Sequence, residues 1–159
     1  MLECIRNNEY LCAEKLPRDL FDQFGELLNG EPEPSTSPIL EFFLIACLPE
    51  GCAGNAIVRN QESSIEVLLS PKLDKIRTTI RSVFGEGALC KAPAKVCKVL
   101  VALIAQGNKL TPAQLQSNDL TLDKAAAQLA KEVEKAGGDG RTLAKSSYAW
   151  GLMNLLGAY

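Results

Sequence analysis

The stretch 92–108, APAKVCKVLVALIAQGN, constrains the fold most strongly because it holds the longest nearly unbroken apolar run in the chain. Between residues 96 and 105, only Lys98 is polar. Such a run is either a buried strand or a helix that is covered on most sides. Its length favours a helix, as do Pro93 in the position of a first helical turn and Gly107 after the end.

This run predicts a core helix over residues 92–106. A helix needs about 20 apolar residues to cross a bilayer, so the run is too short for a membrane span. The chain has 159 residues, a length at which one domain with one sizeable core is usual. We therefore expect a mainly α protein, a single domain over residues 1–159, with about six to seven helices bundled around the 92–106 helix.

Apolar residues recur at helical intervals in several other segments, which supports the same fold class. The segment 17–30 carries a stripe that includes Leu27, and the segments 71–87 and 122–138 carry one stripe each. The segment 38–50 is apolar almost all round, which predicts a second buried helix.

Two segments break the helical pattern. Residues 30–37 are rich in proline, serine and glutamate, which predicts a solvated internal loop or linker. Residues 55–69 hold two short runs with β-branched residues, AIVR and SIEVLL, around the polar NQES. This pattern predicts a small β-hairpin. A helix across residues 63–69 is the alternative.

Reactive groups are sparse in this sequence. It contains no histidine, so the commonest metal ligand and general base are missing, together with every Ser-His or Cys-His nucleophile. Four residues separate Cys47 from Cys52, and six separate Cys90 from Cys97. Neither spacing is the short CxxC of zinc and redox sites. We therefore expect no metal site, no cofactor and no disulfide framework.

Catalysis is not predicted by the remaining residues. Among the cysteines we take Cys90, beside Lys91, as the one candidate nucleophile, because a basic neighbour favours a thiolate. No serine lies in a nucleophile motif. The N-terminal sequence MLECIRNNEY has no apolar signal core, which favours a reducing, intracellular and cytoplasmic location. The sequence therefore predicts a non-enzymatic protein.

Charge is distributed unevenly along the chain. Residues 1–70 hold four basic and twelve acidic residues, whereas residues 71–159 hold thirteen basic and seven acidic ones. Such asymmetry can mark a nucleic-acid or membrane surface, or a head-to-tail contact between subunits. The alternative is that the two halves pack together and their charges partly cancel.

The basic residues are densest in the segment 71–98. Nucleic-acid binding would use them against phosphates, although such binders usually add stacking aromatics, and Phe84 is the only aromatic residue there. The alternative is a solvated basic face that pairs with the acidic half. The candidate nucleic-acid-binding residues are Lys72, Lys75, Arg77, Arg81, Lys91, Lys95 and Lys98.

The last segment, 140–159, carries more large apolar residues than one helix face can hide. Either it docks in a groove of its own core or it offers apolar side chains to a partner. The candidate partner-binding residues are Tyr148, Trp150, Met153 and Leu156. We therefore expect a protein-interaction or assembly subunit, an adaptor or homo-oligomer. Nucleic-acid binding through residues 71–98, as in a coat or packaging protein, is the alternative.

Overall fold

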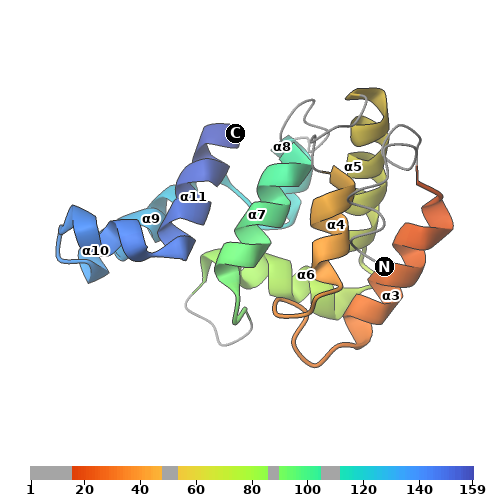
Figure 1. Cartoon of the computed structure of the whole chain (residues 1–159), viewed down its shortest axis with the longest axis horizontal. Helices are drawn as coiled ribbons and strands as arrows, with labels where there is room; N and C mark the ends of the chain where they lie inside the picture. The colour runs from red at the N-terminus through yellow and green to blue at the C-terminus, as the bar shows by residue number, and fades with distance from the viewer. Residues whose placement is uncertain (1–15, 48–53, 86–89, 105–111) are drawn as a thin grey trace.

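The computed structural model describes residues 16–47, 54–85, 90–104 and 112–159, and over these residues the protein is mainly α, as predicted, with no strand. Elements keep the labels of Figure 1. The elements are α3 (Arg18–Gly30), α4 (Leu40–Cys47), α5 (Gly54–Leu68), α6 (Asp74–Arg81), the 3-10 turn η1 (Ser82–Phe84), α7 (Pro93–Ile104), α8 (Pro112–Ser117), α9 (Leu122–Lys135), α10 (Gly140–Lys145) and α11 (Ser147–Ala158).

Helix α7 is the helix that the apolar run predicts. It begins at Pro93, and residues 105 and 106 of the expected span lie outside the described residues. Its buried side chains include Val96, Leu100 and Leu103. The helix packs against α4 and α5 on one side and α11 on the other (Figure 1). It therefore joins the two parts of the core.

Aromatic side chains fill the core between α3 and α4. The rings of Phe21 and Phe42 are 5.2 Å apart, and those of Phe42 and Phe43 are also 5.2 Å apart in an edge arrangement. Phe24 stacks on Phe42 at 4.1 Å. Gly25, in the same helix, faces Val67 so closely that a Cβ atom would overlap the valine. The glycine therefore permits close contact between α3 and α5.

The β-hairpin expected near residues 55–69 is wrong, because these residues belong to helix α5. The β-branched Ile65 and Val67 are buried against the core, and tertiary packing of this kind readily overrides intrinsic propensity. The buried side chain of Asn60 makes two hydrogen bonds to the rest of the chain: its amide N–H donates to the carbonyl oxygen of Ala46 at 3.0 Å, and its oxygen accepts from the Leu16 N–H at 3.2 Å. The alternative helix across residues 63–69 lies largely within α5.

The segment 30–37 leaves α3 and forms turns, as a loop does, but it is not solvated as expected. Ser35 and Ser37 are buried. The Ser35 hydroxyl accepts hydrogen bonds from the backbone N–H groups of Lys91 at 3.1 Å and Ala92 at 3.2 Å. The loop therefore binds the segment just before α7, where the Ser35 hydroxyl accepts from two backbone N–H groups. The amino group of Lys95, in the first turn of α7, also donates to the backbone carbonyl oxygen of Ser37 at 2.9 Å.

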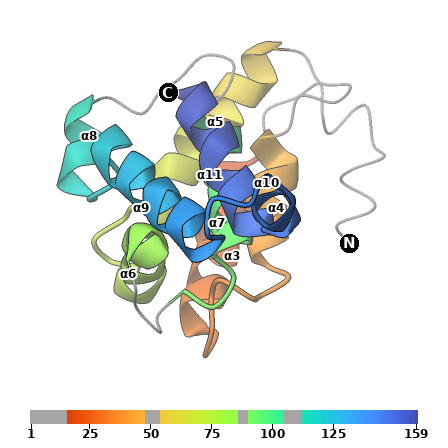
Figure 2. The same ribbon diagram turned by 90° about the vertical axis from the view of Figure 1, so that its left-hand side faces the viewer.

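Helices α9, α10 and α11 form the C-terminal arm (residues 122–158), which extends away from the rest of the protein (Figure 1). Figure 2 views the molecule from the end of this arm, with α11 between α9 and α10. Helix α11 packs on α7 and α9. A Cβ atom added to Gly151 would lie 2.9 Å from the Cβ of Cys97, so this glycine permits the close contact of α11 with α7.

Candidate interaction surfaces

The four predicted partner-binding residues of α11 have different environments. Tyr148 is half-buried, and its hydroxyl donates to the carbonyl oxygen of Val83. Leu156 packs against the core, and Met153 is only partly exposed. Trp150, in contrast, is 51% exposed. Most of the apolar surplus of the last helix is therefore used within the chain, and Trp150 is the large apolar side chain that α11 leaves at the surface.

The indole of Trp150 is held in place by the end of α10. Its Nε1–H donates to the carbonyl oxygen of Ala144 at 3.0 Å. The Ser146 hydroxyl caps α11 by accepting from the N–H of Ala149 at 3.1 Å. An exposed tryptophan with a fixed rotamer loses little conformational entropy when it binds, so it is well suited to a protein contact.

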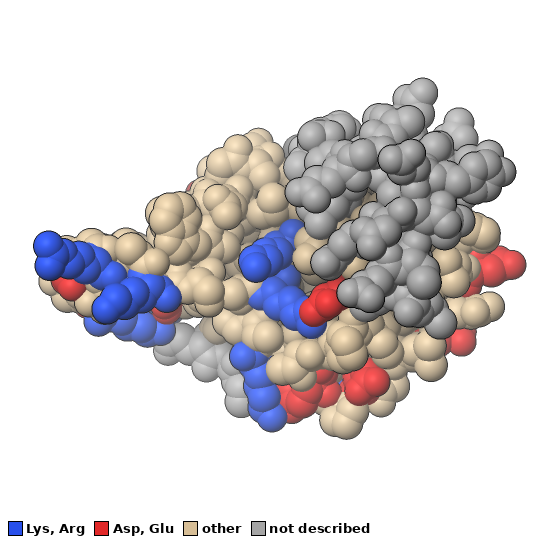
Figure 3. Space-filling view, in the orientation of Figure 1, with Lys and Arg blue, Asp and Glu red and all other residues tan. Residues whose placement is uncertain are grey.

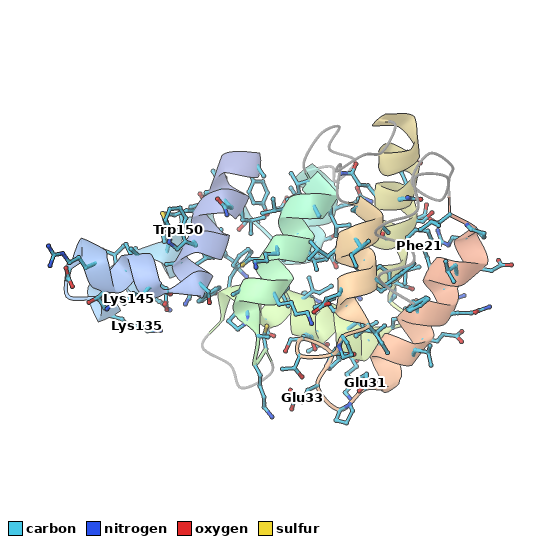
Figure 4. The ribbon with its side chains drawn as sticks, in the orientation of Figure 1. Phe21, Glu31, Glu33, Lys135, Lys145 and Trp150 are labelled. Carbon is cyan, nitrogen blue, oxygen red and sulfur yellow. The ribbon has the colours of Figure 1, made fainter. Side chains whose placement is uncertain are left out.

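Basic side chains lie at the same end of the arm as this tryptophan, in the arm tip, which we define as residues 135–150. Figure 4 shows Lys135 and Lys145 at the same end of the arm as Trp150, and Figure 3 shows Lys and Arg atoms gathered there. Arg141 and Lys145 are both exposed and lie one turn apart on α10. The arm tip therefore presents an apolar ring beside positive charge.

The one acidic residue of the arm tip, Asp139, serves as the N-cap of α10. Its carboxylate accepts from the Thr142 hydroxyl at 2.6 Å and from the Arg141 backbone N–H at 3.1 Å. These hydrogen bonds hold the pKa of Asp139 below its ordinary value, with the Thr142 bond as the main cause. The carboxylate is therefore committed to the helix end, where negative charge is favourable.

A second surface feature, which the sequence patterns did not reveal, is a hollow beside α3. Its volume is 440 Å³. We call it the α3 hollow. It is lined by three carboxylates, two cations and two apolar side chains: Asp22, Glu26 and Glu66, then Arg18 and Lys72, then Val67 and Leu73. Because its residues come from α3, α5 and the segment just before α6, no short sequence window contains them together.

The charges of the α3 hollow are partly paired. Arg18 contacts Asp22 at 3.1 Å and also pairs with Glu66. Both carboxylates stay largely open to solvent, with side-chain exposures of 50% for Asp22 and 63% for Glu66. Helix α3 adds the exposed Asp19 and Glu26. The rim of the hollow is therefore negative on balance. Leu27, expected in the apolar stripe of α3, is 59% exposed on the same helix.

The predicted nucleic-acid-binding residues do not all face solvent freely. Lys91 pairs with Glu33 at 2.7 Å, and Lys95 pairs with Glu41 at 3.1 Å. The amino group of Lys75 donates to the backbone carbonyl oxygen of Glu31. Figure 4 shows Glu31 and Glu33 together on the loop after α3. These contacts match the alternative in which the basic segment pairs with the acidic half.

Two further basic residues of this segment bind the turn before α9. Arg81 contacts Asp119 at 3.1 Å, and the Nε–H of Arg77 donates to the side-chain oxygen of Asn118 at 3.2 Å. Lys72 lines the α3 hollow, and Lys98 is exposed on α7. The seven candidates are thus distributed over several surfaces, and five of them already contact an acceptor.

The described cysteines are poorly suited to nucleophilic chemistry. Burial raises the pKa of Cys47 to about 12, and burial likewise raises the pKa of Cys97 to about 12. Burial also raises the pKa of Cys90. Lys91, the basic neighbour of Cys90, is paired with Glu33. Thiolates are therefore disfavoured at all three positions, because each thiol is more stable in its neutral form.

Over the described residues, histidine, cysteine and acidic side chains nowhere gather in a group of three or more that could hold a metal ion. The helices described are also too short or too polar to span a membrane. Comparison with protein-family models, curated proteins and solved structures gives no match to the chain. Its function is therefore inferred from its own residues.

Proposed function

We propose that this protein is a non-enzymatic subunit of an intracellular protein assembly, and that it binds another protein chain through the arm tip. The observation that carries this proposal is Trp150, which is 51% exposed and yet fixed by its hydrogen bond to Ala144. Buried aromatic anchors with a charged rim are typical of protein interfaces. Arg141 and Lys145 supply that rim.

The chemistry of the described residues supports a binding role over catalysis. The pKa values of the buried thiols are raised, and the sequence contains no histidine that could activate a nucleophile. The ion pairs of Lys91 and Lys95 with the acidic half likewise favour protein binding over the nucleic-acid alternative. Such pairs reduce the charge available for phosphate contacts.

The proposal is tested by comparing substitutions at two exposed apolar residues of the arm. Leu122, at the start of α9, is 48% exposed and matches Trp150 in this respect. We expect Trp150→Ala to remove both self-association and binding to a co-purified protein, measured by light scattering of the purified protein and its complexes. Leu122→Ala should leave them unchanged, because it lies outside the arm tip.

A third variant separates the effect of losing the aromatic ring from the effect of losing the hydrogen bond that fixes it. Trp150→Phe keeps an aromatic ring but loses the N–H that bonds Ala144, so it should retain most of the binding. If Trp150→Ala forms the same complexes as the unsubstituted protein, the arm tip is not the binding surface and the proposal is wrong.

A further inference from the structure

The arm tip and the α3 hollow carry opposite charge. The arm tip projects an apolar ring beside Arg141 and Lys145. The α3 hollow has a volume of 440 Å³, and its three carboxylates outnumber its two cations, so its lining is negative on balance. The positive side chains beside Trp150 are therefore attracted to the negative lining of the hollow, because opposite charges across an interface attract.

These two surfaces cannot meet within one molecule. Helix α10 and helix α3 lie at opposite ends of the longest axis of the protein (Figure 1). The Tyr148 hydroxyl, which bonds the Val83 carbonyl oxygen, and the close approach of Gly151 to Cys97 connect the arm to the core rather than to α3. Any contact between the arm tip and the α3 hollow therefore joins two molecules.

We propose that the occupant of the α3 hollow is the arm tip of a second copy of this chain. Trp150 of one copy enters the hollow of the next, and Arg141 and Lys145 face Glu26 and Glu66 there. This inference rests on the proposed function, since it names the partner of the arm tip. The contact is heterologous, because the arm tip of one copy meets a different surface, the α3 hollow, on the next copy.

A heterologous contact has a distinctive consequence for size. Each added copy leaves one arm tip and one hollow unoccupied, so growth continues unless the rotation between copies closes a ring. The protein is therefore expected to form oligomers whose mean mass rises with concentration. Because exposed charges contribute to the contact, salt should weaken it.

The test reverses the charge of each surface separately and then of both. The arm-tip variant is Arg141→Glu with Lys145→Glu, and the hollow variant is Glu26→Lys with Glu66→Lys. By sedimentation velocity, we expect each variant to dissociate at concentrations where the unsubstituted protein is oligomeric, with an apparent Kd raised at least about tenfold by like-charge contacts. The chain with all four substitutions should recover oligomers, because the charges are complementary again.

The variants also separate the effect of net charge from the effect of charge at the two surfaces. The four-substitution chain keeps the net charge of −2 of the unsubstituted protein. A control chain with Lys91→Glu and Lys124→Glu has the same net charge as the arm-tip variant, but it changes residues that pair with Glu33 and Asp119 elsewhere. This control should still form oligomers. Circular dichroism checks that every variant keeps its helices.

Three outcomes would overturn the inference. The unsubstituted protein stays monomeric at all concentrations, the hollow variant associates as strongly as the unsubstituted protein, or the four-substitution chain stays monomeric. The proposed function is judged separately by Trp150→Ala. If that variant loses a co-purified protein while the hollow variant keeps it, the arm tip binds a different chain, and only the head-to-tail contact is wrong.

Discussion

Gly151 shows how a single residue determines the position of the arm. A Cβ atom there would lie 2.9 Å from the Cβ of Cys97, which is closer than carbon atoms pack without a shift of one helix. Gly157 lies in the same helix, and a Cβ atom there would meet nothing within 4 Å. The two glycines thus have opposite roles, although their sequence context is similar.

We therefore expect Gly151→Ala to destabilise the protein by about 1–3 kcal/mol, because it overpacks the contact between α11 and α7. Gly157→Ala should be neutral or stabilising by up to about 1 kcal/mol, since alanine is the better helix former. Urea unfolding measures both free energies. Equal stability of the two variants would contradict the close contact between the helices.

The buried thiols predict a loss of stability at alkaline pH. Cys47 keeps its proton in the folded state until about pH 12, whereas its ordinary pKa is 9.0. Its stabilising contribution is fully present below about pH 9 and is lost as the pH rises toward about 12. The slope for one such group is about 1.4 kcal/mol per pH unit.

This loss is measured as the free energy of unfolding in urea at several alkaline pH values. Cys47→Ala removes the titrating group, so its stability should fall less steeply over the same pH range than that of the unsubstituted protein. Parallel pH profiles for the two proteins would contradict the raised pKa of Cys47.

Among the elements, α7 was the most predictable and α5 the least. The apolar run identified α7 because a helix covered on most sides needs few polar residues. Helix α5 was mistaken for a hairpin because Ile65 and Val67 favour strands in isolation. Their burial against α3 and α4 decides in favour of a helix, and this tertiary contact is not visible in a short sequence window.

The two candidate surfaces also differ in how far the sequence predicts them. Trp150 was predictable, because α11 carries more large apolar residues than one face can bury. The α3 hollow was not, because Glu26 and Glu66 come from helices that are distant in sequence. The buried Ser35 was also missed, since a serine-rich loop is usually solvated.

The next prediction concerns nucleic-acid binding by the basic residues of α6 and α7. Because Arg77 and Arg81 bind Asn118 and Asp119, we expect weak binding to RNA or DNA and little dependence on salt, measured by fluorescence anisotropy. Changing both arginines to glutamate should leave this weak binding unchanged. Tight, salt-dependent binding that the change abolishes would support the nucleic-acid alternative instead.

The whole molecule shows how the uneven charge of the sequence is used. Part of it cancels inside one copy, where Glu33 and Glu41 pair with Lys91 and Lys95. Figure 3 shows basic atoms at the end of the arm and acidic atoms at the opposite end of the molecule. We infer that these charges at the two ends of the molecule attract each other between copies rather than within one copy.

The central claim is that Trp150 becomes covered when the protein binds another chain. It is the only tryptophan in the sequence, so acrylamide quenching of tryptophan fluorescence reports on this residue alone. We predict strong quenching in dilute protein at high salt, and weaker quenching with a blue-shifted emission as concentration rises at low salt. The arm-tip variant should show no such change. Quenching that stays constant while light scattering detects oligomers would contradict the claim.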